Sequence, residues 1–454
     1  MEQVILGIDI GSSKTCSIIA EIKSGSPYII GTGMQTSKGI RKGAITNIEQ
    51  ASRAIRESVN QAKRIAGVDI SQAYISLSGV YTKSIDSIGV INNPRDDIGI
   101  QEINRVMQAA LYNANIPKNY EVVHVLPYLF KVDDRDYIDD PFGMSGTRIE
   151  VSVHIVIAQK SGLENLKKAV KNAGIEISGI VLSAYASSIA VLNNDEKELG
   201  AACIDMGASS CDIMIHYGNS MRYDDFLGVG SGHITNDIVM ALTIPPLVAD
   251  TIKIKYATLN ELTQEERGSY LEIPSNTSPT EARKVELEVL HSVVFSRALE
   301  TMQIIEHSLE KSGLKNNLGA GIVITGGMAH MNGLKELAKG IFPNLPIRIA
   351  TPREINDSFS MLKDPIYATV AGLILYGAGK WTNYEIDSTK KLKHTQNNNI
   401  LTNTSLSDIE VKENDLSDLQ MAKNAEDAIK LGRKNDKNEN GVVDKIVNFF
   451  KSLF

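Results

Sequence analysis

The sequence has few of the residues on which small secreted or metal-stabilised proteins depend. Among its 454 residues are three cysteines and one tryptophan, and no cysteine stands in a CxxC pair or near a histidine at metal-ligand spacing. A disulfide framework and a zinc site are therefore not indicated, and a reduced cytoplasmic compartment is expected. A chain of this length predicts two or more lobes.

Excess basic charge and long apolar runs are also absent. The formal net charge is −7 at pH 7, so the sequence lacks the positive character that nucleic-acid binding normally requires. No run of about 18 apolar residues occurs, and the N-terminus has no basic segment followed by a long apolar one. These absences argue against nucleic acid as a partner, against secretion and against a membrane-spanning helix, but not against attachment to a membrane surface.

The chain up to about Lys380 carries apolar strands of β-branched residues that alternate with helical patterns, which is typical of an α/β protein. One long amphipathic helix is expected to begin after Asn47, a good N-cap residue, and to stop at Gly67. A strand-rich insertion over residues 81–158 surrounds a predicted helix near residues 102–113. This insertion is long enough to form an α+β subdomain.

The C-terminal part changes character twice. Residues 383–440 are rich in Lys, Asn, Asp, Ser and Thr, which predicts a disordered linker. Residues 441–454 then place their apolar side chains on one arc of a helix, which predicts an amphipathic helix lying in a membrane surface. Docking on the protein's own core or on a partner is the alternative, and the long polar tether argues against self-docking. The apolar positions are Val442, Val443, Ile446, Val447, Phe449, Phe450, Leu453 and Phe454.

Two stretches far apart in the chain repeat one pattern. "ILGIDIGSSKTCSIIAEI" and "GAACIDMGASSCDIMIHY" each contain an apolar strand, an aspartate, a Gly/Ser turn and a second strand, which indicates a duplicated domain. Such turns offer backbone N–H groups to an anion, and the aspartate can hold Mg²⁺ through water. Two ordinary hairpins are the simpler alternative. The positions are Asp9, Gly11, Ser12, Ser13 and Lys14 in the first turn, and Asp205, Gly207, Ala208, Ser209 and Ser210 in the second.

A third glycine turn follows in the last third of the sequence. In "VITGGMAHMNG", Gly326 and Gly327 come after a buried strand and before a helix. The backbone there could pass close under a flat group such as adenine or ribose. Taken alone, a tight strand-to-helix connection would explain it equally well.

The order of these three turns resembles the actin-like ATPase superfamily, which includes actin, DnaK-type chaperones and sugar kinases. Stretches such as "GIRKGAITNIEQA", "DPFGMSGTRIEVSVHIV" and "ITNDIVMALTIPPLVADTIK" are similar to the FtsA family of bacterial cell-division proteins, and the resemblance covers most of residues 1–380. It implies an α/β, actin-like (ribonuclease H-like) fold of two lobes with duplicated sheet and helix domains. The implied first lobe is 1–80, 159–200 and 365–382, the inserted subdomain 81–158, the second lobe 201–233 and 292–364, its small subdomain 234–291, the disordered tail 383–440 and the amphipathic helix 441–454.

The resemblance also implies a nucleotide site for ATP with Mg²⁺. The two turns would hold the phosphates, Asp9 and Asp205 would hold Mg²⁺ through water, and Asp250 and Lys253 would lie near the purine and ribose. Gly326, Gly327 and Met328 would contact the adenosine. Compared with the family pattern, Ala208 replaces a glycine, Ser210 a threonine and Asp250 a glutamate.

Hydrolysis is a separate question, because it needs a group that orients the attacking water. The stretch "VLSAYASSIAVL" offers Ser and Tyr where actin and the chaperones carry Glu or Gln, so no catalytic residue is assigned. We expect ATP binding with at most slow hydrolysis, and no role as a metabolic enzyme.

The implied partners are those of a division protein at the cytoplasmic face of the cell membrane, at the septum. They are the C-terminal tail of FtsZ, received by residues 234–291, further copies of the chain in a polymer, later division proteins through residues 81–158, and an anionic membrane surface. A small-molecule kinase of the same superfamily and a PilM-type pilus-assembly adaptor are the alternatives. The tethered amphipathic terminus argues against both, and "DPFGMSG" against the second.

Overall fold

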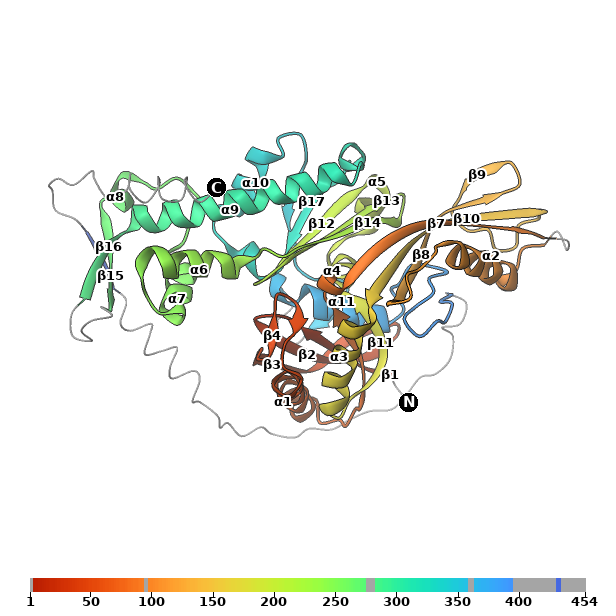
Figure 1. Cartoon of the computed structure of the whole chain (residues 1–454), viewed down its shortest axis with the longest axis horizontal. Helices are drawn as coiled ribbons and strands as arrows, with labels where there is room; N and C mark the ends of the chain where they lie inside the picture. The colour runs from red at the N-terminus through yellow and green to blue at the C-terminus, as the bar shows by residue number, and fades with distance from the viewer. Residues whose placement is uncertain (1–2, 94–96, 275–281, 358–362, 395–429, 434–454) are drawn as a thin grey trace. The chain divides into compact units, whose positions relative to one another are not determined.

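The computed structural model of the chain describes residues 3–93, 97–274, 282–357, 363–394 and 430–433 (Figure 1). It contains two compact units, each built from segments that are distant in sequence. Unit 1 consists of Met1–Gly228, Leu309–Gly327 and Leu345–Ile409, and unit 2 of Val229–Ser308, Met328–Asn344 and Glu410–Phe454.

The first sheet of unit 1 has six strands. Its first three strands form an antiparallel meander, and β6 and β11 continue the sheet in parallel beside β1. In sheet order the strands are β11 (Glu176–Leu182), β6 (Gln72–Leu77), β1 (Gln3–Ile10), β2 (Lys14–Lys23), β3 (Ser26–Thr36) and the short β19 (Asn356–Asp357).

The second sheet of unit 1 repeats this topology. Its three leading strands again form an antiparallel meander, and two parallel strands follow beside the first of them. The order is β14 (Ser220–Leu227), β13 (Cys211–Tyr217), β12 (Ala201–Met206), β17 (Gly321–Thr325) and β18 (Ile347–Ile349). Both sheets thus run third, second, first, fourth, fifth, which confirms the predicted duplication.

Two helices pack against the first sheet, and their ends follow the sequence signals. Asn47 caps α1 (Ile48–Ala66) by accepting a hydrogen bond from the Gln50 N–H, and Gly67 ends it with a φ of 67°. Both ends are as predicted. α1 and α3 (Lys160–Asn172) bury apolar side chains in a cluster shared with strands of this sheet. The remaining short elements of unit 1 are β4 (Ile40–Arg41), β5 (Ala44–Ile45) and α5 (Asn194–Leu199).

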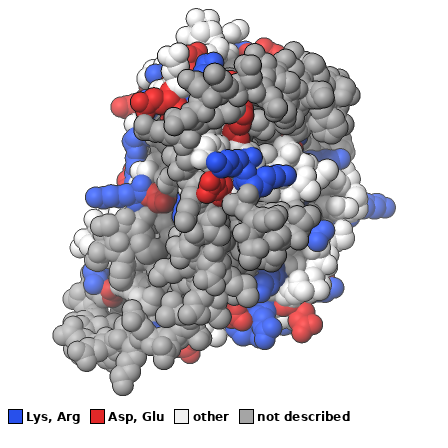
Figure 2. Space-filling view, turned by 90° about the vertical axis from the view of Figure 1, so that its left-hand side faces the viewer, with Lys and Arg blue, Asp and Glu red and all other residues white. Residues whose placement is uncertain are grey.

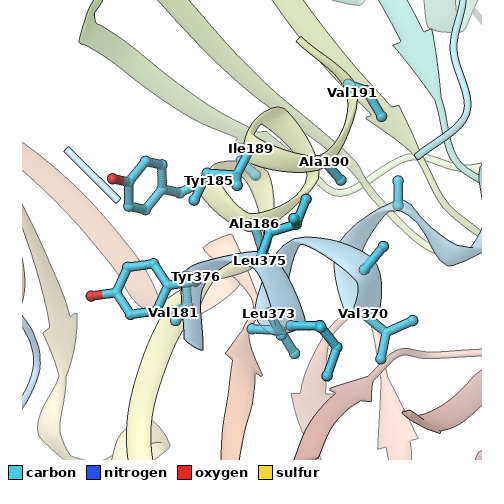
Figure 3. Packing of buried hydrophobic residues seen from close by; sticks show 14 of the residues in the cluster. Val181, Tyr185, Ala186, Ile189, Ala190, Val191, Val370, Leu373, Leu375 and Tyr376 are labelled. Atoms are coloured by element: carbon cyan, nitrogen blue, oxygen red, sulfur yellow. The ribbon is translucent and has the colours of Figure 1, made fainter. Parts of the chain in front are cut away.

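A second pair of helices lies in a core that includes strands of both sheets. α4 (Ser183–Val191) and α11 (Ala368–Gly377) share this cluster with residues of β1, β2, β12 and β13 (Figure 3). The helices approach so closely that a Cβ on Gly372 would stand 1.8 Å from the Ala186 carbonyl oxygen. No other residue fits there without separating the two helices.

The inserted segment forms its own sheet with a helix packed on it. The strand order is β7 (Thr82–Asn92), β10 (Arg148–Gln159), β8 (Tyr120–Val132) and β9 (Arg135–Ile138), and α2 (Ile100–Asn113) shares its apolar cluster. His154 joins this sheet to β14, with ring nitrogens 2.9 Å from Asp86 Oδ1 and 2.7 Å from Asp224 Oδ1. Burial alone would lower the pKa of His154, but the two carboxylates outweigh burial and raise that pKa to about 9.

The chain after α11 returns to the inserted sheet. The Val125 N–H donates to the Ile386 carbonyl at 3.0 Å, and the Ile386 N–H donates back to Val125 at 3.1 Å. Tyr384 and Glu385 are buried beside this contact. The disordered linker was predicted to begin at residue 383. Instead, residues 383–393 are ordered, because Ile386 pairs with Val125 and its neighbours are buried against the inserted sheet.

Unit 2 combines helices with a small sheet. Its helices are α6 (Ser231–Leu242), α7 (Pro246–Tyr256), α8 (Gln264–Arg267), α10 (Leu334–Ile341) and most of α9 (Leu287–Lys311). The sheet has the order β16 (Ala282–Glu286), β15 (Ser269–Pro274) and β20 (Lys430–Arg433). β20 falls within the sequence range assigned to the linker, and the predicted amphipathic helix over residues 441–454 lies outside the described residues. No helix within the described ranges is both long and apolar enough to cross a membrane.

Candidate nucleotide site

The two repeated motifs form matching hairpins in unit 1. In the first, which we call loop 1 (residues 11–13), the Gly11 N–H donates to the Lys14 carbonyl at 3.1 Å. In the second, loop 2 (residues 207–210), the Gly207 N–H donates to the Ser210 carbonyl at 2.8 Å. Each hairpin joins the first and second strands of its sheet, so each aspartate stands at the same place in its own repeat.

Asp9 is partly buried near the end of β1. Its Oδ1 accepts a hydrogen bond from the Ser76 hydroxyl at 3.0 Å, and the same hydroxyl oxygen accepts the Ile10 N–H at 2.8 Å. Burial raises the pKa of Asp9 to about 6, and the nearby Asp205 adds to this, while Lys14 and Ser76 oppose it.

Asp205 ends the equivalent strand of the second sheet and is held by hydroxyls from two helices. Its Oδ2 accepts hydrogen bonds from Ser187 on α4 at 2.5 Å and from Thr369 on α11 at 3.0 Å. Burial raises the pKa of Asp205, against the opposing effect of these two hydroxyls and of Lys14. Ser187 comes from the stretch in which actin and the chaperones carry an acidic or amide side chain, and here it positions a carboxylate.

The glycine turn after β17 lies directly against this carboxylate. Gly326 has a φ of 86°, and a Cβ built on it would stand 2.2 Å from Asp205 Oδ1. A side chain at this position would be strained in its backbone and would displace the aspartate. The structure therefore brings the turn at Gly326 and loop 2 together within unit 1.

Lys14 supplies a buried cation to the same cluster. Its Nζ donates to the Ile366 carbonyl at 2.9 Å and lies 5.0 Å from the centroid of the Tyr367 ring. Burial lowers the pKa of Lys14, and the neighbouring negative groups, Asp9 and Asp205 among them, counteract this. The charge of Lys14 thus acts on two carboxylates, one from each repeat.

A third carboxylate, Asp212, belongs to the cluster and was missed by the sequence analysis. It pairs with Asp205 in the register of β12 and β13, and burial together with the charge of Asp205 raises its pKa to about 7. Ser210 donates to its Oδ2 at 3.3 Å, and the Gly79 backbone and Ser210 both oppose the rise in the pKa of Asp212. No three His, Cys, Asp or Glu side chains of the described residues are grouped as metal ligands, so a divalent cation beside these carboxylates would be held through water.

Comparisons with known proteins identify the family of the chain. The family models "SHS2 domain inserted in FTSA" and "Cell division protein FtsA" match residues 79–157 and 202–372. A cell division protein FtsA of Helicobacter pylori is 43% identical over 415 residues, which cover 85% of this chain and 84% of that protein. One from Pseudomonas aeruginosa is 33% identical over 380 residues, covering 83% and 90%.

The chain belongs to the FtsA family of cell division proteins. The resemblance stated from the sequence is thereby confirmed, together with the role in cell division that the family name carries. A solved PilM–PilN type IV pilus biogenesis complex matches with a TM-score of 0.60 and covers 82% of this chain and 98% of that one. At 15% sequence identity, this structural match shows only that the two chains share the actin-like fold.

Some expected site residues of this FtsA-family chain lie in unit 2. Lys253 Nζ is 2.6 Å from Asp250 Oδ1 and 2.8 Å from Thr235 Oγ1, so these residues on α6 and α7 form one polar cluster. Met328 is buried at the start of the unit 2 segment that follows Gly327. Their proposed contacts with purine, ribose and adenosine remain predictions.

The remaining loop residues have local roles. Ser12 Oγ accepts the Gly43 N–H at 2.8 Å, and the Ser13 carbonyl accepts the Ser37 N–H at 2.9 Å, which fixes the shape of loop 1. In loop 2, Ala208 and Ser209 are partly exposed. No local sequence signal marks Ser187 and Thr369, because their roles depend on helix packing. Asp212 could have been found by comparing loop 2 with its following strand.

Proposed function

We propose that this FtsA-family chain is an actin-like, ATP-binding division protein that polymerises at the cytoplasmic face of the membrane, at the septum. There it anchors the FtsZ ring and helps to recruit later division proteins. The observation that carries this proposal is the group of three carboxylates, Asp9, Asp205 and Asp212, at the bases of two hairpins related by duplication, with Lys14 acting on the first two.

The nucleotide and its metal are assigned to this cluster. Backbone N–H groups and hydroxyls of loops 1 and 2 would hold the phosphates, and Asp9 and Asp205 would hold Mg²⁺ through water, with Asp212 as a third acidic neighbour. The bound cation would neutralise phosphate charge. The hydroxyls that contact the carboxylates, from Ser187 and Thr369, are poor general bases, so the site favours holding ATP over rapid hydrolysis.

The partner assignments follow the family. Residues 234–291, which include most of α6 together with α7, β15 and β16, are proposed to receive the FtsZ tail. The inserted sheet is proposed to contact neighbouring protomers and later division proteins. Residues 441–454 are proposed as the membrane anchor. A single short helix of this kind binds weakly, so polymerisation would strengthen attachment by joining many anchors.

Loss of Lys14 or of the Asp205 charge tests the nucleotide site. We expect Lys14→Ala and Asp205→Asn each to weaken Mg·ATP binding by at least about tenfold, because each removes a charge-assisted contact of about 1.5–3 kcal/mol. Titration of a fluorescent ATP analogue with and without EDTA measures this. Asp69→Asn is the matched control, since Asp69 is 93% exposed and forms an exposed ion pair with Lys63 at 2.7 Å. Wild-type affinity in both site variants would refute the assignment.

The membrane anchor is tested by charge placed on either face of the predicted helix. Phe449→Asp with Phe450→Asp puts two negative charges on the apolar face, and we expect sedimentation with phosphatidylglycerol vesicles to fall at least about tenfold. Asn448→Asp with Ser452→Asp adds the same charge to the polar face and should reduce binding far less. Equal losses in the two variants would show that charge, not apolar burial, governs attachment. ATP binding should persist in both.

A further inference from the structure

The small sheet of unit 2 is completed by a segment from the far end of the chain. β15 pairs on one side with β16 and on the other with β20, antiparallel in both cases. The tail register is Ser269 with Arg433, Tyr270 with Gly432, Leu271 with Leu431 and Glu272 with Lys430. Without β20, one whole side of β15 would be an open row of backbone donors and acceptors.

β15 is held in a fixed register by its own side chains. Leu271 and Ile273 are fully buried, so a slip by one residue would turn them out of the core. On the alternate positions, Lys284 Nζ lies 4.1 Å from the Tyr270 ring centroid and donates to the Tyr270 hydroxyl at 3.0 Å. The strand is therefore a rigid template to which a further strand can add.

The pairing suits the tail sequence. The register places Lys430 opposite Glu272 and Leu431 opposite Leu271. Gly432, which has no side chain, stands opposite the bulky Tyr270. In the space-filling view, acidic and basic side chains are interspersed among the described residues that are visible (Figure 2).

We propose that the edge of β15 is a strand-addition site and that the chain's own Lys430–Arg433 is its resident occupant, which clips the tail to unit 2. Docking of β20 shortens the distance that residue 441 can lie from the folded part of the chain. Residues 434–440 allow at most roughly 25 Å between β20 and residue 441, whereas residues 394–440 would allow about 160 Å from Lys393. The consequence for a membrane anchor rests on the proposed function, but the strand contact does not.

The clip also makes β15 a site of competition. A segment in the same chain occupies its site at a high effective concentration, so an extended peptide of similar pattern from outside binds only when the resident strand leaves. Such a peptide has the pattern basic residue, leucine, glycine, basic residue. The docked tail thus protects the edge of the sheet against pairing with other chains.

Hydrogen exchange on the full-length protein, without lipid or nucleotide, tests the clip. We expect the hydrogen-bonded amides of Lys430–Arg433 to exchange at least about tenfold more slowly than unstructured amides. Leu431→Pro with Gly432→Pro should abolish this protection and expose amides of Ser269–Glu272, because proline removes both N–H groups. Asn403→Pro with Thr404→Pro is the matched control in the tail and should leave the protection intact.

Binding of a synthetic peptide of residues 426–437 provides the second readout. The full-length Leu431→Pro, Gly432→Pro protein should bind this peptide at least tenfold more tightly than the unsubstituted protein. Unprotected tail amides in the unsubstituted protein, or equal peptide affinity for the two proteins, would overturn the proposal. Since no membrane is present, failure of the anchor proposal would not alter either result.

Discussion

Replacing Glu385 by alanine is expected to lower the free energy of unfolding by about 3–5 kcal/mol, since it removes the shared acceptor of a buried polar network. Glu385 is fully buried. Its Oε1 is 2.7 Å from His124 Nδ1 and accepts the Tyr376 hydroxyl at 2.7 Å, and its Oε2 accepts the Tyr185 hydroxyl at 3.0 Å. Alanine would leave three buried polar groups without this partner.

The roles within the network are fixed by its neighbours. The Leu182 N–H donates to His124 Nε2 at 3.1 Å, so Nδ1 carries the proton and donates to Glu385. Burial, and then the charge of Glu385, raise the pKa of Tyr185 and Tyr376 well above the usual value, so both hydroxyls remain donors. Figure 3 shows the two tyrosines projecting in the same direction from α4 and α11.

The measurement is urea unfolding followed by circular dichroism, with two comparison variants. Glu385→Gln keeps the volume and one acceptor oxygen, so its loss should be smaller, about 1–3 kcal/mol. Glu354→Ala removes an exposed carboxylate 2.9 Å from Lys380 Nζ, and should cost at most about 1 kcal/mol. Similar midpoints for Glu385→Ala and Glu354→Ala would show that the network adds little to stability.

Asp212→Asn is expected to stabilise the nucleotide-free protein at pH 8 by roughly 2–4 kcal/mol while weakening Mg·ATP binding. The pKa of Asp212 is about 7 in the folded chain against 3.8 for an unperturbed aspartate, because burial penalises its charge. Above pH 7 the folded protein must hold this charge unfavourably, and asparagine removes it. Under the proposed function, the same negative charge attracts the Mg²⁺ that accompanies ATP, so its removal weakens Mg·ATP binding.

The pH dependence gives the sign of the effect. Between pH 4 and 7 the folded state keeps a proton on Asp212 that the unfolded state has released, so this group lowers stability as pH rises through that window. The gain from Asp212→Asn should therefore be near zero at pH 4, grow up to about pH 7 and stay constant above. Thermal melts of both proteins at pH 4, 6 and 8 measure it. A gain independent of pH, or none at pH 8, would contradict the assigned environment.

Local sequence signals predicted local structure well. Asn47 and Gly67 marked the ends of α1 because capping depends on residues within one turn. The repeated Asp-x-Gly pattern predicted two equivalent hairpins, because strand, turn and strand follow one another directly in the chain. The order of three glycine turns was sufficient for the actin-like fold, and longer stretches such as "DPFGMSGTRIEVSVHIV" were needed for the family.

Contacts between segments that are distant in sequence could not be predicted from local sequence patterns. Thr369 reaches Asp205 across 164 positions, and Glu385 reaches His124 across 261. Each is a polar residue of ordinary appearance whose role is set by the packing of helices and sheets. The linker boundary at residue 383 failed for the same reason, because the burial of Tyr384 and Ile386 depends on a sheet formed far earlier in the chain.

The way Asp205 is held carries an evolutionary consequence. This carboxylate belongs to the second repeat, yet one of its two hydroxyl partners lies on the helix that directly follows the last parallel strand of the first repeat, and the other near the end of the folded chain. The first repeat, by contrast, holds Asp9 with Ser76 of its own strand β6. A gene fragment encoding only the second repeat would thus yield Asp205 without its supporting hydroxyls, which favours inheritance of the two repeats together.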